Sequence, residues 1–256
     1  MIFIKFNKVY LDIPIIDASR RIFKKNTKVD FSDQLIGSKR LNSDKKIFSR
    51  ILDNINFEVN EGDSIALIGH NGSGKTTLLR LIAGIYKQTS GDIKYSGIIS
   101  AILNIGAVLS LEATGYQNIT IITNYLKQFD INEEKLHKYI REVSGLGDFL
   151  NMPIKNYSSG MQARLIFSIT LYLKTDIAIV DEGISTGDEQ FRTTAHGLLE
   201  EHLSSIKIKF FASHDENFLR QNCNRAFVMK KGKLRIFENV DDGFKFYYSN
   251  EYKEIN

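Results

Sequence analysis

The sequence predicts an α/β fold in which helices cover both faces of a mostly parallel sheet. Three observations support this prediction. A glycine-rich loop at residues 69–77 lies between an apolar run and a helical pattern. A second apolar run, Ile177–Val180, is followed by two carboxylates. Beyond the loop, segments with strand character alternate with segments of helical periodicity, an arrangement typical of parallel sheets.

The glycine-rich loop matches the phosphate-binding pattern G-x-x-x-x-G-K-[ST]. Its glycines let the backbone turn successive N–H groups toward an anion, and the start of the next helix adds partial positive charge. We expect Lys75 to reach the β- and γ-phosphates of a nucleotide and Thr76 to offer its hydroxyl to Mg²⁺. A glycine-rich turn that binds nothing is the alternative, but the flanking strand and helix favour the phosphate site. The residues expected to hold the nucleotide are Gly69, His70, Asn71, Gly72, Ser73, Gly74, Lys75, Thr76 and Thr77.

The composition is that of a globular protein with a core of its own. Of the 256 residues 43% are hydrophobic, and the formal net charge is only +4, which does not decide between acidic lipid, nucleic acid and other partners. No apolar run reaches the roughly 18 residues that a membrane-spanning helix needs, since polar residues interrupt Ile98–Leu109. The first residues lack the layout of a signal peptide, and Cys223 is the single cysteine. We therefore expect a cytoplasmic protein.

The first elements precede the phosphate loop. Apolar and polar residues alternate in Ile2–Leu11, which predicts a strand. Residues 12–46 are polar and strongly basic, and we expect a solvated excursion. A short basic amphipathic helix at Ala18–Lys25, lying on a membrane surface or a partner, is the alternative. Strand character resumes at Ile51–Val59, and Asn60–Asp63 is a turn leading into the strand before the loop.

The elements after the loop follow from the same two periodicities. Residues 93–103 predict strands, and from Glu112 to Leu150 apolar residues recur at helical spacing until Gly145 and Gly147 interrupt them. The hairpin is indicated by Lys231-Gly232 between two strand-like runs. The remaining expected elements are a helix at Leu165–Leu173, a strand at Ile177–Val180, a helix at Gln190–Leu203, a strand at Ile206–Ala212 and the hairpin Ala226–Phe237.

Two carboxylates follow the apolar run Ile177–Val180. They fall at the carboxyl edge of a predicted parallel strand, where ligands of open α/β sheets collect. Asp181 is placed to hold Mg²⁺ through water, and Glu182 to orient and deprotonate an attacking water. An ordinary strand end is the alternative, but the phosphate loop in the same chain favours the catalytic interpretation.

Two further segments have the chemistry of a nucleotide site. Hydroxyls and a glycine precede the helix that begins near Gln162, which predicts either an N-cap or a second anion site. The residues of that segment are Ser158, Ser159, Gly160 and Met161. His214 follows the strand Ile206–Ala212. A lone histidine is usually structural, yet a neutral imidazole at a strand end can contact a γ-phosphate or the attacking water.

This order of motifs resembles the ATP-binding subunit of ABC transporters over nearly the whole chain. Gly69–Thr76 resembles the Walker A motif, Ser158–Gly160 the signature motif and Ile177–Glu182 the Walker B motif with its catalytic glutamate. Ser185–Asp188 resembles the D-loop, and His214 the switch histidine. The resemblance implies a P-loop NTPase fold of the ABC type in a single domain, residues 1–256. That fold has a mostly parallel core sheet, an antiparallel β subdomain and an inserted helical subdomain, here at about residues 112–165.

Within that family, three segments resemble the branch that exports capsular polysaccharide, O-antigen and teichoic acid. They are Met152–Met161, Ala113–Ile119 and Ser185–Asp188. Ile13–Arg20 is similar to O-antigen exporters in particular. The resemblance implies an ATPase, with ATP and Mg²⁺ as cofactors, that powers polysaccharide export. Some O-antigen exporters have a C-terminal carbohydrate-binding domain, and we expect none in this chain.

The resemblance also implies partners. Two copies would face each other head to tail, so that ATP on the phosphate loop of one copy contacts Ser158–Met161 of the other. Closure on ATP and opening after hydrolysis would drive a separate membrane-spanning permease. We therefore expect a homodimer, peripheral on the inner membrane, and no nucleic-acid partner.

The sequence departs from the family pattern at two sites. The glutamine that senses Mg²⁺ after the third strand is replaced by Ser110, and Gln117 is too far along the chain. The aromatic residue that stacks on adenine has no clear counterpart. Ile13 occupies the aligned position, Tyr10 is slightly early, and Phe23 or Phe48 would have to fold back.

Other functions remain as alternatives. One is the ATPase of an importer or drug exporter. Another is a soluble ABC-type ATPase acting on nucleic acid or ribosomes, although such proteins usually have long coiled-coil insertions or two ATPase halves. A third, a nucleotide-binding regulator without hydrolysis, is disfavoured by Glu182.

Overall fold

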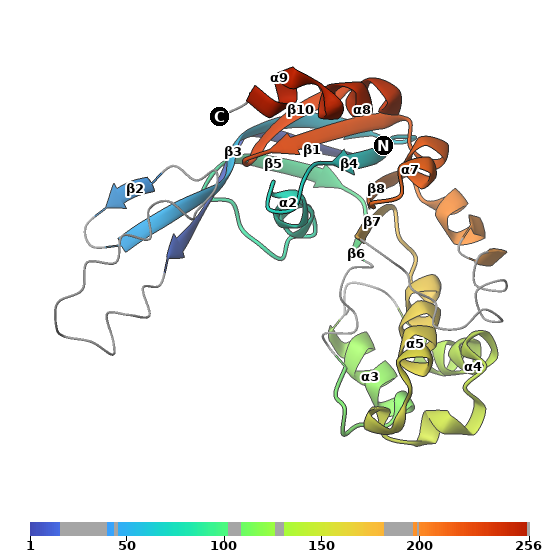
Figure 1. Ribbon diagram of the computed structural model, residues 1–256. Coiled ribbons are helices and arrows are strands. Elements are labelled where there is room, and N and C mark those ends of the chain that lie inside the picture. Colours follow the sequence, from blue (N-terminus) through green and yellow to red (C-terminus); the bar gives the residue numbers. More distant parts are fainter. Residues whose placement is uncertain are drawn as a thin grey trace. The chain divides into compact units, whose positions relative to one another are not determined.

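The computed structural model describes residues 1–15, 40–43, 46–101, 109–125, 131–181, 197–198 and 200–254. These residues form two compact units (Figure 1). The first unit comprises residues 1–96 and 210–256, and the second comprises residues 97–209. Strands and helices occur in both units, which confirms the predicted α/β class.

An antiparallel sheet in the first unit has the strand order β2-β3-β1-β5. Strand β1 pairs with β3 from Phe3 opposite Asn60 to Ile15 opposite Ile47. The prediction that the first strand ends at Leu11 was therefore wrong, because β3 begins early enough to supply hydrogen-bond partners to the next residues. The alternative helix at Ala18–Lys25 lies outside the described residues. The strands are β1 (Phe3–Ile15), β2 (Arg40–Ser43), β3 (Lys46–Asn60) and β5 (Ser90–Ser96).

A second sheet runs through the first unit in the order β10-β9-β4-β8. Strands β4 and β9 are parallel, and all five residues of β4 are buried. The predicted hairpin is confirmed: β9 and β10 pair antiparallel, and Lys231 and Gly232 both have the positive φ that a tight two-residue turn requires. The bounds are β4 (Ser64–Ile68), β8 (Ile208–Ala212), β9 (Arg225–Lys230) and β10 (Lys233–Phe237).

Four helices belong to the first unit. Helix α2 buries its leucines, as the periodicity predicts. The other three were not predicted, because they are short. Two of them begin at a single side-chain cap: Asp215 accepts from the Phe218 N–H and Asn239 from the Asp242 N–H. Gly243 allows α8 to approach β9, since a Cβ there would lie 2.4 Å from the Cβ of Ala226. The helices are α2 (Lys75–Ile82), α7 (Glu216–Asn222), α8 (Val240–Tyr248) and α9 (Asn250–Glu254).

The second unit contains a helical core and a parallel strand pair. Buried aliphatic side chains, including Ile119, Leu136, Ile140 and Leu165, form the core. Helix α4 ends at Ser144, so the predicted break at Gly145 is confirmed, and Gly145 has the left-handed conformation. Of the helix predicted at Gln190–Leu203, the described residues 197–198 and 200–203 are helical. The elements are β6 (Ile99–Ala101), β7 (Ile177–Asp181), α3 (Gly115–Tyr125), α4 (Glu133–Ser144), η3 (Gly147–Asn151), η4 (Ile154–Asn156) and α5 (Ser159–Tyr172).

Candidate functional site

The phosphate-binding loop begins where β4 ends, at Gly69, and stops where α2 begins, at Lys75. Gly69 and Gly74 have φ of 156° and 108°, backbone angles that L-residues with a side chain rarely adopt. Space is also closed at Gly69: a Cβ there would meet the Met229 carbonyl oxygen at 2.5 Å and the Ser73 Oγ at 2.7 Å. The glycine spacing read from the sequence is therefore required by both backbone conformation and packing.

The Lys75 side chain turns back over the loop that precedes it. Its Nζ donates to the carbonyl oxygens of Gly69 at 2.5 Å and His70 at 3.2 Å. The ammonium group is thus held beside the backbone of the loop. Thr76 and Thr77 follow in the first turn of α2.

The buried hydroxyl of Ser73 bears on whether the loop suits an anion. Its side chain is 1% exposed, and its Oγ has no hydrogen-bond partner among the described residues. The backbone is paired on both sides, because the N–H donates to His70 and the carbonyl accepts from the Gly232 N–H. A buried hydroxyl without a partner is unfavourable by about 1–3 kcal/mol. A glycine cradle, a lysine and an unsatisfied hydroxyl together fit a phosphate group.

His214 lies in the turn between β8 and α7, and its side chain is exposed. The turn is ordered by its neighbours, since Ser213 Oγ accepts from the Asp215 N–H. A cavity of about 110 Å³ joins this turn to the phosphate loop. The structure thus brings together Lys75 and His214, which come from separate motifs. The lining residues include Gly69, Lys75, Ser213, His214, Glu216 and Tyr248.

The acidic and signature motifs belong to the second unit. Asp181 is the last residue of β7, whose residues Ile177–Ile179 are fully buried, so the predicted strand is confirmed. Glu182 and the D-loop residues Ser185–Asp188 lie outside the described residues. Among the residues that the structure describes, no group of three or more His, Cys, Asp and Glu side chains could hold a metal ion.

The signature segment starts α5. The Ser158 Oγ accepts a hydrogen bond from the Met161 N–H at 3.2 Å, so the predicted N-cap is confirmed. Ser159 and Gly160 form the first turn of the helix. A cavity of about 160 Å³ opens beside this turn. Its lining residues are Gly145, Leu146, Phe149, Ser158, Met161 and Arg164.

The two departures from the family pattern have local explanations. Ser110 is exposed, and its backbone is held on both sides by the Asn118 amide. Gln117 is engaged in capping α3, since its Oε1 accepts from the Thr114 N–H and its N–H donates to the Thr114 Oγ1. The glutamine side chain is therefore committed to the helix start.

The aromatic candidates for adenine lie on the antiparallel sheet. The Tyr10 ring is covered by the Arg50 guanidinium, 4.9 Å from its centroid. Arg50 donates two hydrogen bonds to Asp12, and these raise the pKa of the guanidinium. Phe48 and Ile13 are partly buried in paired strands, and Phe23 lies outside the described residues.

Sequence reasoning missed the contribution of the C-terminal helices to this site. Tyr247 and Tyr248 of α8 line the cavity with Lys75 and His214. Tyr252 of α9 makes a ring contact with His70 of the phosphate loop, with centroids 6.3 Å apart. A signal was present, because residues 244–248 contain four aromatic residues in five.

Within the described part of the chain, no helix is both long and apolar enough to cross a membrane.

Comparisons with known proteins agree with the motifs. The family model described as ABC transporter matches residues 52–185. The chain is 36% identical, over 90% of its own length and 95% of the relative, to the O-antigen export system ATP-binding protein RfbE of Yersinia enterocolitica. It is 35% identical, over 77% of this chain and 89% of the relative, to the ATP-binding protein BexA of Haemophilus influenzae. It is also 35% identical, over 91% of this chain and 86% of the relative, to the teichoic acids export ATP-binding protein TagH of Staphylococcus haemolyticus.

Two solved structures share the fold. One is a dimeric ATP-binding cassette in a post-hydrolysis state with ADP and phosphate bound; the TM-score is 0.63 at 17% identity, over 92% of this chain and 98% of that chain. The other is the ATP-binding subunit of an ABC transporter, with a TM-score of 0.66 at 16% identity, over 98% of this chain and 97% of that chain. At these identities the likeness concerns the fold alone.

Proposed function

This chain belongs to the ABC transporter family, and we propose that it is the ATPase subunit that powers export of a cell-surface polysaccharide through a separate membrane-spanning permease. Relatives named for the export of O-antigen and teichoic acid support the polysaccharide as cargo. The structural observation that most supports the ATPase site is the shared cavity of Lys75 and His214. In this cavity a cation and an imidazole lie beside the loop suited to phosphate.

On this proposal, Lys75 and the N–H groups of the loop stabilise the charge that develops on the transferring γ-phosphoryl group. Glu182 orients the attacking water and accepts its proton, and His214 contacts the γ-phosphate in the closed state. When bound, Mg²⁺ would neutralise charge on the phosphate oxygens. Thr76 and Asp181 would hold it, since hydroxyl and carboxylate oxygens are the donors that this ion prefers.

We propose that two copies of the chain form the active unit. Ser158–Met161 of one copy would then contact the nucleotide on the phosphate loop of the other. The N-terminus of α5 supports this role, because the first turn of a helix offers unpaired N–H groups and partial positive charge to an anion. A solved neighbour of the same fold is itself dimeric. The protein would work at the cytoplasmic face of the inner membrane, bound to its permease.

The test is co-purification from native membranes. A tagged chain at native expression is extracted in mild detergent, and the proteins that remain bound are identified. We expect a multispanning permease, and we expect loss of the gene to remove a surface polysaccharide. A permease of another substrate class would favour the importer or drug-exporter alternative. A chain that stays in the soluble fraction and binds nucleic acid in a salt-sensitive manner would contradict the proposal.

A further inference from the structure

We propose that two tyrosines of the C-terminal helices are positioning residues for the nucleotide site. Tyr252 holds the phosphate loop, and Tyr248 holds the turn that contains His214. The proposal rests on the nucleotide site described above, but not on the identity of the transported cargo. All the residues concerned belong to the first unit.

Tyr252 contacts both the sheet and the phosphate loop. The Oη donates to the carbonyl oxygen of Met229 at 3.1 Å, and the ring contacts the His70 ring of the loop with centroids 6.3 Å apart. Met229 is the residue whose carbonyl oxygen closes the space at Gly69. One buried side chain therefore bridges the edge of the loop and the strand against which the loop packs.

Tyr252 is itself firmly held. Its side chain is 6% exposed, and its ring packs on Tyr247 with centroids 5.0 Å apart. The Lys230 ammonium lies 4.9 Å from the ring centroid and donates to the carbonyl oxygens of Tyr252 and Lys253. Burial raises the pKa of the phenol, although the His70 backbone acts in the opposite direction. The hydroxyl thus keeps its proton near neutral pH and can donate it to the Met229 carbonyl oxygen.

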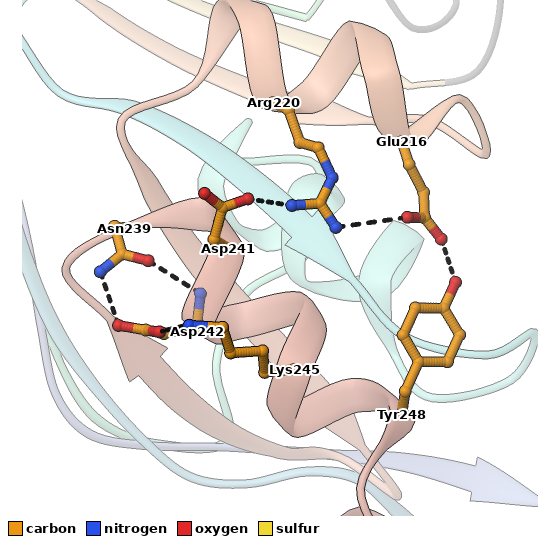
Figure 2. A network of polar contacts seen from close by, with 7 residues as sticks. All are labelled: Glu216, Arg220, Asn239, Asp241, Asp242, Lys245 and Tyr248. Carbon is orange, nitrogen blue, oxygen red and sulfur yellow. Dashed lines mark hydrogen bonds and ion pairs between the residues drawn. The ribbon is translucent and has the colours of Figure 1, made fainter.

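Tyr248 lines the cavity that Lys75 and His214 share, and Figure 2 shows its ring hydroxyl directed toward Glu216. Its hydroxyl donates to the carboxylate of Glu216, the first residue of α7 and the second after His214. Glu216 also pairs with Arg220, which reaches Asp241 at the start of α8. Helices α7 and α8 are therefore tied together by a chain of charged contacts beside the His214 turn.

The remaining contacts in Figure 2 hold the start of α8. The Asn239 Oδ1 accepts from the Asp242 N–H at 2.8 Å, and Lys245 pairs with Asp242 at 2.9 Å. These contacts are exposed, and surface ion pairs contribute little individually.

The two tyrosines differ in burial, since the side chain of Tyr248 is 59% exposed and that of Tyr252 is buried. We therefore expect loss of the Tyr252 hydroxyl to have the larger effect on the nucleotide site.

We therefore expect Tyr252 to affect nucleotide affinity and Tyr248 to affect turnover. A loop that receives phosphate and a group that contacts the reacting atoms must each be held to within a fraction of an ångström. Loss of the Tyr252 hydroxyl would leave the Met229 carbonyl without that partner and loosen the side chain that packs against His70, so nucleotide affinity should fall. Loss of the Tyr248 hydroxyl would loosen the His214 turn, so turnover should fall instead.

The experiment compares Tyr252→Phe and Tyr248→Phe with Tyr95→Phe, a matched control whose side chain is 58% exposed on β5. The full chain is used, and the Kd for ATP, kcat and Tm are measured. We expect Tyr252→Phe to raise the Kd about tenfold, which corresponds to loss of one buried hydrogen bond. Tyr248→Phe should lower kcat about two- to threefold with the Kd unchanged. Tyr95→Phe should alter neither quantity.

Hydrogen exchange in the nucleotide-free chain provides a readout that does not depend on catalysis. Tyr252→Phe should speed exchange in peptides that contain residues 69–73, and Tyr248→Phe in peptides that contain residues 213–216. A lowered Tm with unchanged Kd, kcat and local exchange would overturn the proposal, since it would assign both hydroxyls a purely structural role. These measurements need neither permease nor polysaccharide, so failure of the proposed export function would leave their outcome intact.

Discussion

The carbonyl oxygen of Met229 occupies the space that any side chain on Gly69 would need. A Cβ at Gly69 would lie 2.5 Å from that oxygen, and the φ of 156° already disfavours an L-residue. The phosphate loop is therefore shaped from outside as well as by its own glycines. The oxygen belongs to β9, which pairs in parallel with the strand that leads into the loop.

Gly69→Ala should displace the loop from β9 and abolish detectable ATP binding. Gly62→Ala is the matched control, because Gly62 also has a positive φ of 99° but nothing lies within 4 Å of the position that a Cβ would take. The control should lose about 1–2 kcal/mol of stability and keep ATP affinity. Titration calorimetry and urea denaturation measure the two quantities. Equal effects of both substitutions would mean that backbone strain, not the Met229 contact, determines the result.

Glu182→Gln should retain ATP binding and ATP-dependent dimerisation while turnover falls by about 10²- to 10⁴-fold, since the amide cannot accept the proton of the attacking water. Lys75→Ala should instead lose ATP affinity. Light scattering with and without ATP, together with phosphate release, separates the two outcomes. Full turnover in Glu182→Gln would remove this residue from the proposed mechanism.

Ser158 allows the structural and functional roles of the signature segment to be separated. Ser158→Ala removes the cap and should destabilise the protein by about 1 kcal/mol. Ser158→Asp keeps a good capping side chain, so the Tm should be largely preserved. The aspartate would place negative charge against the phosphates of the partner copy, so dimerisation on ATP should be lost. ATP-dependent dimerisation of Ser158→Asp at the level of the unaltered protein would argue against contact in trans.

Asn118 should be among the most sensitive positions of the second unit. Its amide is fully buried, accepts from the Ser110 N–H and donates to the carbonyl oxygens of Ser110, Ala113 and Thr114. Asn118→Ala leaves several buried groups unpaired, and we expect a loss of about 2–4 kcal/mol in urea unfolding. The exposed Asn151 provides the control, and Asn151→Ala should change stability by less than about 0.5 kcal/mol. A similar urea midpoint for both variants would contradict the assigned role of the Asn118 amide.

His202 should make stability depend on pH. Burial lowers the pKa of its imidazole below the usual 6.5, so the unfolded chain takes up a proton at a higher pH than the folded chain does. Stability is then fully present above about pH 6.5 and falls as the pH drops from there through the folded pKa. Chemical denaturation at several pH values should show a smaller fall for His202→Gln. His214→Gln is the control because that ring is exposed, and an equal change in both variants would exclude His202 as the source.

Contiguous motifs allowed the chemistry of the site to be predicted. Residues 69–77 specify their own turn, because glycine conformational freedom, the preceding buried strand and the following helix are all local properties. The helix stop at Gly145 and the hairpin turn at Lys231-Gly232 were predicted for the same reason. By contrast, the length of β1 depends on a partner strand: Ile15 is a strand residue because Ile47 lies opposite it.

The sequence by itself determined the α/β class, the phosphate loop and the identities of Lys75 and His214, because short-range backbone preferences and side-chain chemistry are properties of adjacent residues. Only the tertiary structure decided that Lys75 and His214 share a cavity and that Tyr252 contacts the loop at His70. These contacts join residues far apart in the chain. They arise from the packing of α8 and α9 beside the sheet, and no local pattern specifies which distant backbone group a buried hydroxyl will meet.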